Sequence, residues 1–498
     1  MSRISHGRRG RSATAASILA ILVLAVSSCG VASERGDAAD GVDPSETTTG
    51  SGGDGSFSPD GGDSPDSTST PTTLPPPTNM VIVGDSGSPV NRIAANAITD
   101  LEAFWGETYP AVYGTPYEPV AGGFYAINRN SRPSTLPCGV WDINQVLHNA
   151  FYCPTDDAVA WDEENLMPDL AKEYGDFVVA VVLAHEWGHA IQDRAAFDQP
   201  IVVVELQADC FAGAWVQHVN SSGKSRFEIT TKDLDQALAG VLSLRDAAGA
   251  ESTDPNAHGS GFDRVSAFQM GFEEGAGRCK DFTVGNPAPR MFAFVGDDKY
   301  TQGDLEMDDI IAKSLASLDG YWADIFPALS GGKAWEPMEP ARAFTRDDPP
   351  TCNGQVVSAF RLFLCVPDRY VGYESATVAD AYRMGDFAVA TLFATQYGLE
   401  VQDQLLKPPG TEAIATVRGD CFSGAWAAAL LAESQPDPAQ GPRYTFHLKP
   451  GDLDEGVRVL LTFRSEADRQ RQGPGFARVK AFRTGVLSGP GACIDLTA

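Results

Sequence analysis

The sequence predicts an α+β fold that is mainly helical and that occurs twice in tandem. A repeat is the first observation: residues 175–194, GDFVVAVVLAHEWGHAIQDR, share their frame with residues 385–404, GDFAVATLFATQYGLEVQDQ. The second observation is that eight cysteines divide four and four between the two halves of the chain. A period of about 210 residues is far too long for a solenoid and indicates a duplicated domain.

The duplication extends well beyond this motif. ADCFAGAW at 208–215 recurs as GDCFSGAW at 419–426. We therefore place the two units at residues 79–287 and 288–498. With 498 residues in all, the chain has enough apolar residues to give each unit its own core.

Hydrophobic periodicity assigns most of the first unit to helices. Apolar runs without internal proline predict helices over residues 175–194, 203–219, 233–245 and 262–272. Strand signals are weaker, and they lie at residues 80–84 and 122–128. Helices with few strands make this unit α+β, and the repeat predicts the same architecture for the second unit.

The N-terminus is typical of an exported lipoprotein. Residues 1–28 combine a basic start with an apolar run too short to span a bilayer, which is typical of a signal peptide. The segment Val26-Ser27-Ser28-Cys29 resembles the lipobox of bacterial lipoproteins, in which the cysteine receives the lipid. An ordinary secretory signal with a chance cysteine is the alternative.

Residues 29–78 form a predicted tether. They are rich in Ser, Thr, Gly, Pro and Asp and contain few bulky apolar residues, so burial cannot offset their ordering entropy. We expect a protein anchored by its lipid to the outer face of the bacterial cell membrane, and otherwise secreted. The formal charge of −29 argues against a nucleic acid as partner.

The remaining cysteines are predicted to form disulfides, because the protein is exported and each half holds four of them. They are Cys138, Cys153, Cys210, Cys279, Cys352, Cys365, Cys421 and Cys493. Four cysteines allow three pairings, and the repeat fits each pairing equally. Closeness in sequence favours Cys138 with Cys153 and Cys210 with Cys279, together with their equivalents. A cysteine zinc site is the alternative, but the sequence has no Cys-x-x-Cys pair.

His185, Glu186 and His189 form a His-Glu-x-x-His motif within the first copy of the repeat. On a helix the two histidines lie one turn apart on the same face, so both imidazoles can bind one ion. Glu186 lies beside them as a candidate general base. Two nitrogens and one carboxylate oxygen suit zinc and leave a fourth position for water or substrate. Two histidines on a helix surface are the alternative interpretation.

A third ligand is predicted in the following helix. Glu205 offers a carboxylate, and Asp209 lies one turn further along the same face. This Glu-x-x-x-Asp arrangement resembles gluzincin metallopeptidases, in which the glutamate binds zinc and the aspartate orients a histidine ligand. Asp209 as the ligand in place of Glu205 is one alternative, and an ordinary solvated helix face is another.

The motifs of residues 79–285 together resemble the neutral zinc metallopeptidase family of bacteria. They include AFYCPTDD at 150–157, HEWGHAIQD, ELQADCFAGAW and HGSGFDR. The resemblance implies a zincin-like fold and zinc-dependent hydrolysis of peptide or protein substrates. Glu186 would then take the proton of the attacking water.

Three further histidines are weighed against ordinary structural roles. His258, within HGSGFDR, is a candidate oxyanion stabiliser, with a structural or surface histidine as the alternative. His148 and His218 are assigned structural roles.

The second unit has lost the groups that this chemistry requires. Thr395, Gln396, Leu399 and Thr416 stand where the first unit has its three ligands and its base. We therefore expect one zinc per chain and a second domain that is either a binding or regulatory domain or a structural partner. For the whole protein, the alternative function is a non-catalytic surface binding protein with a structural zinc site. Glu186 distinguishes the two functions, because a structural site needs no base.

Overall fold

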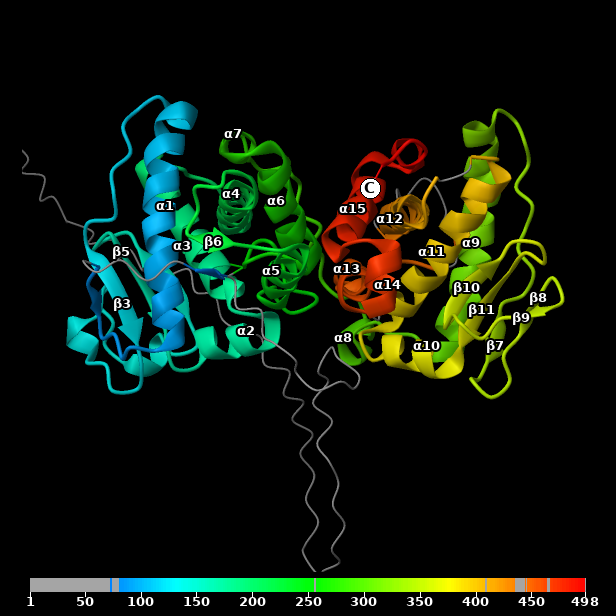
Figure 1. The fold of residues 1–498 in the computed structure, drawn as a ribbon, viewed down its shortest axis with the longest axis horizontal. Coiled ribbons are helices and arrows are strands. Elements are labelled where there is room, and N and C mark those ends of the chain that lie inside the picture. Colours follow the sequence, from blue (N-terminus) through cyan, green and yellow to red (C-terminus); the bar gives the residue numbers. More distant parts are fainter. Residues whose placement is uncertain are drawn as a thin grey trace, which may run out of the picture.

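The structure is a computed structural model, and it describes residues 72–73, 80–254, 257–407, 410–434, 444, 446–463 and 466–497. The predicted signal peptide, Cys29 and nearly all of the predicted tether lie outside these residues. Within them helices predominate over strands, so the predicted α+β class is confirmed. Two units of similar architecture lie side by side (Figure 1). None of the described helices has the length and apolar character needed to cross a membrane.

The first unit packs its helices against a small sheet. The strands are β2 (Ile82–Val83), β3 (Gly123–Ile127), β4 (Ala150–Cys153) and β5 (Ala158–Asp162). The helices are α1 (Pro89–Tyr113), α2 (Leu166–Tyr174), α3 (Phe177–Arg194), α4 (Ile201–Ser221), α5 (Thr231–Ser243), α6 (Gly261–Glu274) and α7 (Ala276–Lys280), with 3-10 turns η1 (Pro133–Thr135) and η2 (Ile143–Gln145). The sheet order is β2-β3-β5-β4, in which β4 is antiparallel to β5 and the other neighbours are parallel. A separate short pair joins β1 (Thr72–Thr73) to β6 (Phe227–Glu228).

The second unit repeats this plan. Its strands are β7 (Arg342–Phe344), β8 (Thr351–Cys352), β9 (Gln355–Val356), β10 (Leu362–Cys365) and β11 (Tyr370–Glu374). Its helices are α8 (Asp298–Thr301), α9 (Met307–Ser330), α10 (Ser375–Tyr382), α11 (Asp386–Gln404), α12 (Glu412–Ser434), α13 (Asp452–Thr462), α14 (Glu466–Gln472) and α15 (Gly475–Ser488), with the 3-10 turn η3 (Pro490–Cys493). The main sheet has the order β10-β11-β7, and β8 pairs with β9 as a separate hairpin.

The core elements of the two units correspond in order and in topology. Helices α1 to α6 match α9 to α13 and α15, with α14 as an addition in the second unit. Strands β3, β5 and β4 match β7, β11 and β10. In each unit the central strand, β5 or β11, has one parallel and one antiparallel neighbour. The predicted tandem duplication of one disulfide-bonded fold is therefore confirmed.

The four disulfides follow closeness in sequence. The first unit forms Cys138–Cys153 and Cys210–Cys279, and the second unit forms Cys352–Cys365 and Cys421–Cys493. One bridge in each unit joins the edge strand of the main sheet to the segment before it, a loop at Cys138 and strand β8 at Cys352. The other ties the long helix α4 or α12 to the end of the unit. Both bridges therefore hold segments that flank the predicted site.

Glycines allow the central helices to approach closely. A Cβ atom on Gly188, within the His-Glu-x-x-His motif, would lie 2.7 Å from a backbone atom of α4. A Cβ atom on Gly213 would lie 1.9 Å from the carbonyl oxygen of Phe268 on α6. The second unit repeats both approaches at Gly398 and Gly424. These glycines recur in both copies because the stack of α3, α4 and α6 leaves no room for a side chain there.

The predicted helices and strands are present. The four helices appear as α3, α4, α5 and α6, and each end lies within two residues of its predicted position. The predicted strands appear as β2 and β3. The sequence analysis assigned no element to β4 and β5, which are buried along their whole length and so lack the alternation that marks a half-exposed strand.

Helix α1 was also not predicted, although its sequence carries both boundary signals. Ser88 precedes Pro89 at the start, and the Ser88 side chain accepts a hydrogen bond from the Asn91 N–H. At the other end Gly114 adopts the left-handed conformation, with φ of 78°.

The two units are joined by a reciprocal helix-capping contact. Asp454, on α13, accepts hydrogen bonds from the backbone N–H groups of Gly261 and Phe262 at the start of α6, at 2.9 and 2.7 Å. Asp235, on α5, does the same for the first two residues of α15, also at 2.9 and 2.7 Å. The two aspartates occupy equivalent repeat positions. Each unit therefore places a carboxylate at the positive end of a helix of the other, in the middle of the molecule (Figure 1).

We expect Asp454→Ala to lower the free energy of unfolding by about 1–3 kcal/mol, because two buried N–H groups lose a charged acceptor. Denaturant titration followed by circular dichroism measures this change. Asp198→Ala, at an exposed aspartate, serves as the control and should change stability by less than about 0.5 kcal/mol. Equal stability of the two variants would contradict the capping role.

Candidate metal centre

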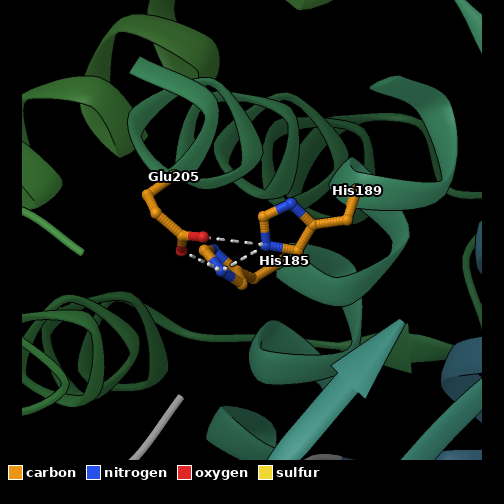
Figure 2. Close-up of side chains that lie close together, drawn as sticks. All are labelled: His185, His189 and Glu205. Atoms are coloured by element: carbon orange, nitrogen blue, oxygen red, sulfur yellow. Dashed lines mark hydrogen bonds and ion pairs between the residues drawn. The ribbon is translucent and has the colours of Figure 1, made fainter. Parts of the chain in front are cut away.

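Helices α3 and α4 bring the three predicted metal ligands together. His185 and His189 lie one turn apart on α3, and their Nε2 atoms are 3.2 Å apart. Glu205 faces them from the start of α4, with one carboxylate oxygen 3.3 Å from Nε2 of His185 and the other 3.6 Å from Nε2 of His189. Figure 2 shows the two imidazoles and the carboxylate converging on one point. The side chains are buried, with exposed fractions of 4%, 10% and 1%.

Asp209 orients His185. Its Oδ1 lies 2.8 Å from Nδ1 of His185, so the Nδ1–H of the imidazole donates to the carboxylate. Arg264, on α6, forms a bidentate ion pair with the same carboxylate at 2.8 and 2.9 Å. Both partners of this ion pair are 1% exposed. Burial raises the pKa of Asp209, but Arg264 and His185 outweigh it and hold the pKa below its ordinary value.

Gln192 orients His189. The Gln192 Nε2 donates to the carbonyl oxygen of Val204 at 2.6 Å, which fixes the orientation of the amide. Its Oε1 therefore faces Nδ1 of His189 at 2.8 Å and accepts the proton carried there. Burial also lowers the pKa of His189, which favours the neutral imidazole that binds metals.

The convergent atoms fit a zinc ion. Because both Nδ1 atoms donate to other residues, each Nε2 directs a lone pair toward Glu205. Neither carboxylate oxygen of Glu205 accepts a hydrogen bond among the described residues, although both are buried. Burial raises the pKa of Glu205, but the effect of His189 and His185 is larger and in the opposite direction. The net pKa therefore lies below its ordinary value, and the carboxylate is charged. Two nitrogen lone pairs and a buried anion need a cation between them, and this donor set with one open position suits zinc.

Glu186 lies next to the ligands with its carboxylate fixed. Its Oε2 accepts a hydrogen bond from the backbone N–H of Tyr152 on β4 at 3.0 Å. β4 is the outer strand of the described sheet. The side chain of Glu186 is 1% exposed. The structure thus places the predicted base between the metal ligands and the edge of the sheet.

His258 lies in the same region, on the loop before α6. Asp246 accepts its backbone N–H at 2.7 Å and lies 3.3 Å from its Nδ1. The Nε2 of His258 is buried and has no hydrogen-bond partner among the described residues. Burial lowers the pKa of His258, but Asp246 and the charge of Glu205 raise it more, so the net pKa lies above its ordinary value.

The other two histidines lie elsewhere in the first unit. The backbone N–H of His148 donates to Asp162, and the His218 ring packs against Phe104. Neither belongs to the group of possible metal ligands.

The second unit keeps the frame of the site without its ligands. Arg478 forms a bidentate ion pair with Asp420 at 2.7 and 2.7 Å, as Arg264 does with Asp209. Gln402 donates to the carbonyl oxygen of Ala415 at 3.0 Å, as Gln192 does at Val204. The sequence analysis missed Gln192 and the two arginines. The repeat could have identified them, because the glutamine occurs in both copies, in IQD and VQD, and so does the arginine, in GFDR and GFAR.

The first unit thus has a candidate metal site, made of two histidines and one glutamate on adjacent helices. Residues 84–201 and 193–282 match the family model described as “Putative neutral zinc metallopeptidase”. Both segments lie in the first unit, so the match agrees with the resemblance that its motifs predicted.

Similar proteins carry no functional description. One is the “Uncharacterized protein YpfJ” of Escherichia coli strain K12, which is 28% identical over 210 residues, covering 37% of this chain and 69% of that protein. Another is the “Uncharacterized protein Rv2575” of Mycobacterium tuberculosis strain H37Rv, which is 29% identical over 152 residues, covering 25% of this chain and 52% of that protein. No solved structure matches the chain.

The repeated arginine offers a matched pair of variants. Arg264→Met and Arg478→Met should each lower the free energy of unfolding by about 3–5 kcal/mol, because each removes the cation that pairs with a buried aspartate. Only Arg264→Met should also weaken zinc binding, by about 10–100-fold, since only Asp209 holds a histidine ligand. Competition with a zinc chelator measures the affinity. If Arg264→Met does not fold, Arg264→Lys provides the same comparison. Equal zinc affinities for variants of the two arginines would contradict the orienting role.

Proposed function

We propose that this protein is an extracytoplasmic zinc metallopeptidase whose single active site lies in the first unit. The observation that supports this most strongly is the convergence of His185, His189 and Glu205 beside the fixed carboxylate of Glu186. The match of the first unit to the zinc metallopeptidase family model agrees with this chemistry. The substrates proposed are peptides or proteins.

The reaction is hydrolysis of a peptide bond by water. His185, His189 and Glu205 would hold the zinc, which when bound would lower the pKa of a water molecule and polarise the substrate carbonyl. Glu186 takes the proton of the attacking water and passes it to the leaving amine. The Tyr152 N–H holds this carboxylate at 3.0 Å, so the base is positioned before the substrate arrives. Asp209 and Gln192 keep both imidazoles in the tautomer whose Nε2 lone pairs face Glu205, where they would hold the zinc.

His258 is proposed to stabilise the negative charge that develops on the carbonyl oxygen. Asp246 fixes the imidazole from its Nδ1 side, so Nε2 carries a proton for donation when the ring is protonated. The raised pKa keeps this imidazole protonated to higher pH than an ordinary histidine. A cationic donor at this place would contribute where charge forms in the transition state.

The N-terminal sequence supports a location at the bacterial cell envelope. A signal peptide over 1–28, a lipid on Cys29 and a tether over 29–78 would hold the enzyme on the outer face of the membrane. Four disulfides agree with an exported protein.

We expect Glu186→Gln to reduce peptide hydrolysis by about 10²–10⁴-fold while one zinc per chain is retained, because the substitution removes the base and none of the ligands. Digestion of a peptide library followed by mass spectrometry measures cleavage, and elemental analysis measures zinc. Glu173→Gln, at an exposed glutamate on α2, is the control. Cleavage by Glu186→Gln at the control rate would contradict the role of Glu186 as the base. No cleavage of any peptide by the unmodified protein would favour the alternative of a binding protein with a structural zinc site, and two zinc ions per chain would contradict a single site.

We expect His258→Gln to lower kcat by about 10²–10³-fold with zinc content unchanged. In the unmodified protein, the contribution of protonated His258 is present at low pH and is lost as pH rises through its raised pKa. The alkaline limb of the kcat profile should therefore lie above the ordinary histidine range and disappear in the variant. His218→Gln, which lies outside the site, is the matched control. An unchanged alkaline limb in His258→Gln would contradict the assignment.

A further inference from the structure

The second unit contains a large cavity where the first unit has its metal centre. The cavity has a volume of about 620 Å³. Thr395, Gln396, Leu399 and Thr416, which replace the base and the three ligands, all line it. Loss of the metal ligands has therefore left a hollow between α11, α12 and β10, and the core has not filled it.

The walls of this cavity are apolar and carry little net charge. Leu362, Leu364 and Leu399 contribute aliphatic side chains. The two arginines on the wall are each paired, Arg478 with Asp420 and Arg471 with a glutamate at the start of α12. The other two charged residues on the wall, Asp403 and Lys407, are of opposite sign. An ionised ligand would therefore exchange its water for a wall with little net charge, which is unfavourable. The composition therefore favours an uncharged, apolar occupant.

Strand β10 presents an open hydrogen-bonding edge beside the cavity. It is the outer strand of the described sheet. The Glu374 N–H donates to the Arg361 carbonyl oxygen, so residues 361 and 374 form a hydrogen-bonded pair. Along an antiparallel ladder such pairs alternate with pairs whose backbone groups point outward. The backbone groups of Leu362 and Leu364 therefore point away from β11. Both residues also line the cavity, so its rim offers N–H and C=O groups in the spacing of a strand.

The first unit shows how this edge is used. Tyr152 holds the position on β4 that Leu364 holds on β10, one residue before the bridged cysteine of each edge strand. There the outward N–H of Tyr152 donates to Glu186. In the second unit Gln396 replaces this glutamate, and its amide donates to the Thr395 hydroxyl instead.

A buried acceptor is a second sign of an incomplete site. In the first unit the Oε1 of Gln192 accepts a hydrogen bond from His189. In the second unit Leu399 replaces this histidine, so the equivalent Gln402 has no such donor. Gln402 lines the cavity and is 5% exposed, and its Oε1 has no hydrogen-bond partner among the described residues. Buried amide oxygens are usually paired, so a ligand with an N–H group would complete this one.

We propose that the second unit is a peptide-binding site without hydrolytic activity. Its ligand is an extended, uncharged peptide segment that pairs with β10 and places a bulky apolar side chain in the cavity. Pairing of main chains gives a strand-addition complex, and the cavity selects the side chain. This proposal does not depend on catalysis by the first unit, because none of the residues that carry it belongs to that unit.

The test uses the full chain carrying Glu186→Gln, in the presence of a metal chelator, so that no peptide is cleaved. The probes are fluorescein-labelled, C-terminally amidated peptides of sequence Thr-Ser-Thr-Val-X-Val-Thr-Ser-Thr, with X as Leu, Phe, Asp or Lys. Fluorescence anisotropy should show the Leu and Phe peptides binding at least tenfold more tightly than the Asp and Lys peptides. Replacing both valines of the Leu peptide by proline should abolish binding, because proline cannot donate to a strand.

Cavity variants assign the binding to the second unit. Thr416→Trp fills the cavity and Leu399→Glu places a charge in it, so each should weaken binding of the Leu peptide at least tenfold. Thr135→Trp, at an exposed threonine of the first unit, is the control and should bind as before. Thermal unfolding identifies any variant that fails to fold, and the other variant then carries the comparison.

Three outcomes would overturn the proposal. They are no binding of the Leu or Phe peptide, binding unaffected by either cavity variant, and saturable binding of dodecanoate at the cavity without binding of peptides. The last outcome would identify an acyl-chain site. Because these measurements follow binding without metal, they are independent of the hydrolysis assay that tests the first unit.

Discussion

The buried ion pair between α4 and α6 is the interaction on which the site and the fold both depend. In the first unit Arg264 holds Asp209 with two hydrogen bonds, and Asp209 in turn holds His185. In the second unit Arg478 and Asp420 form the same pair although there is no histidine to orient. Removing both charges from water is costly, and their mutual pairing offsets much of that cost. The pair is therefore retained where the metal site has been lost, because a single unpaired member would destabilise the helix stack.

Comparison of the two units separates the residues that the helix stack requires from those that only the candidate metal site requires. Gly188 and Gly398 set the same close approach of the central helices, and Gln192 and Gln402 make the same bond to the following helix. These residues persist because the backbone arrangement requires them. The ligands and the base differ between the units, since nothing in the helix stack needs a histidine at those positions. What remains in the second unit is a cavity beside an open strand edge, rather than a refilled core.

The two units stabilise each other through their interface. Asp235 and Asp454 each supply a carboxylate to the start of a helix in the other unit. A helix start leaves N–H groups without intrahelical partners, and burying it requires an acceptor from elsewhere. Each unit provides that acceptor for its twin, and Arg483 of the second unit adds an ion pair with Glu273 of the first. The second unit is therefore part of the environment that stabilises α6, which carries Arg264.

The sequence by itself determined the duplication, the helices around the motif, and the group of His185, Glu186, His189 and Glu205. These features are local or repeat at fixed spacing, so helix periodicity and comparison of the two copies are sufficient to find them. It could not reveal strands β4 and β5, whose fully buried residues lack an alternating pattern. Only the tertiary structure decided that Tyr152 holds the base, that Gln192 fixes a tautomer, and that a cavity occupies the second site. Those facts depend on contacts between segments far apart in the chain, and a one-dimensional pattern does not encode which backbone group meets which side chain.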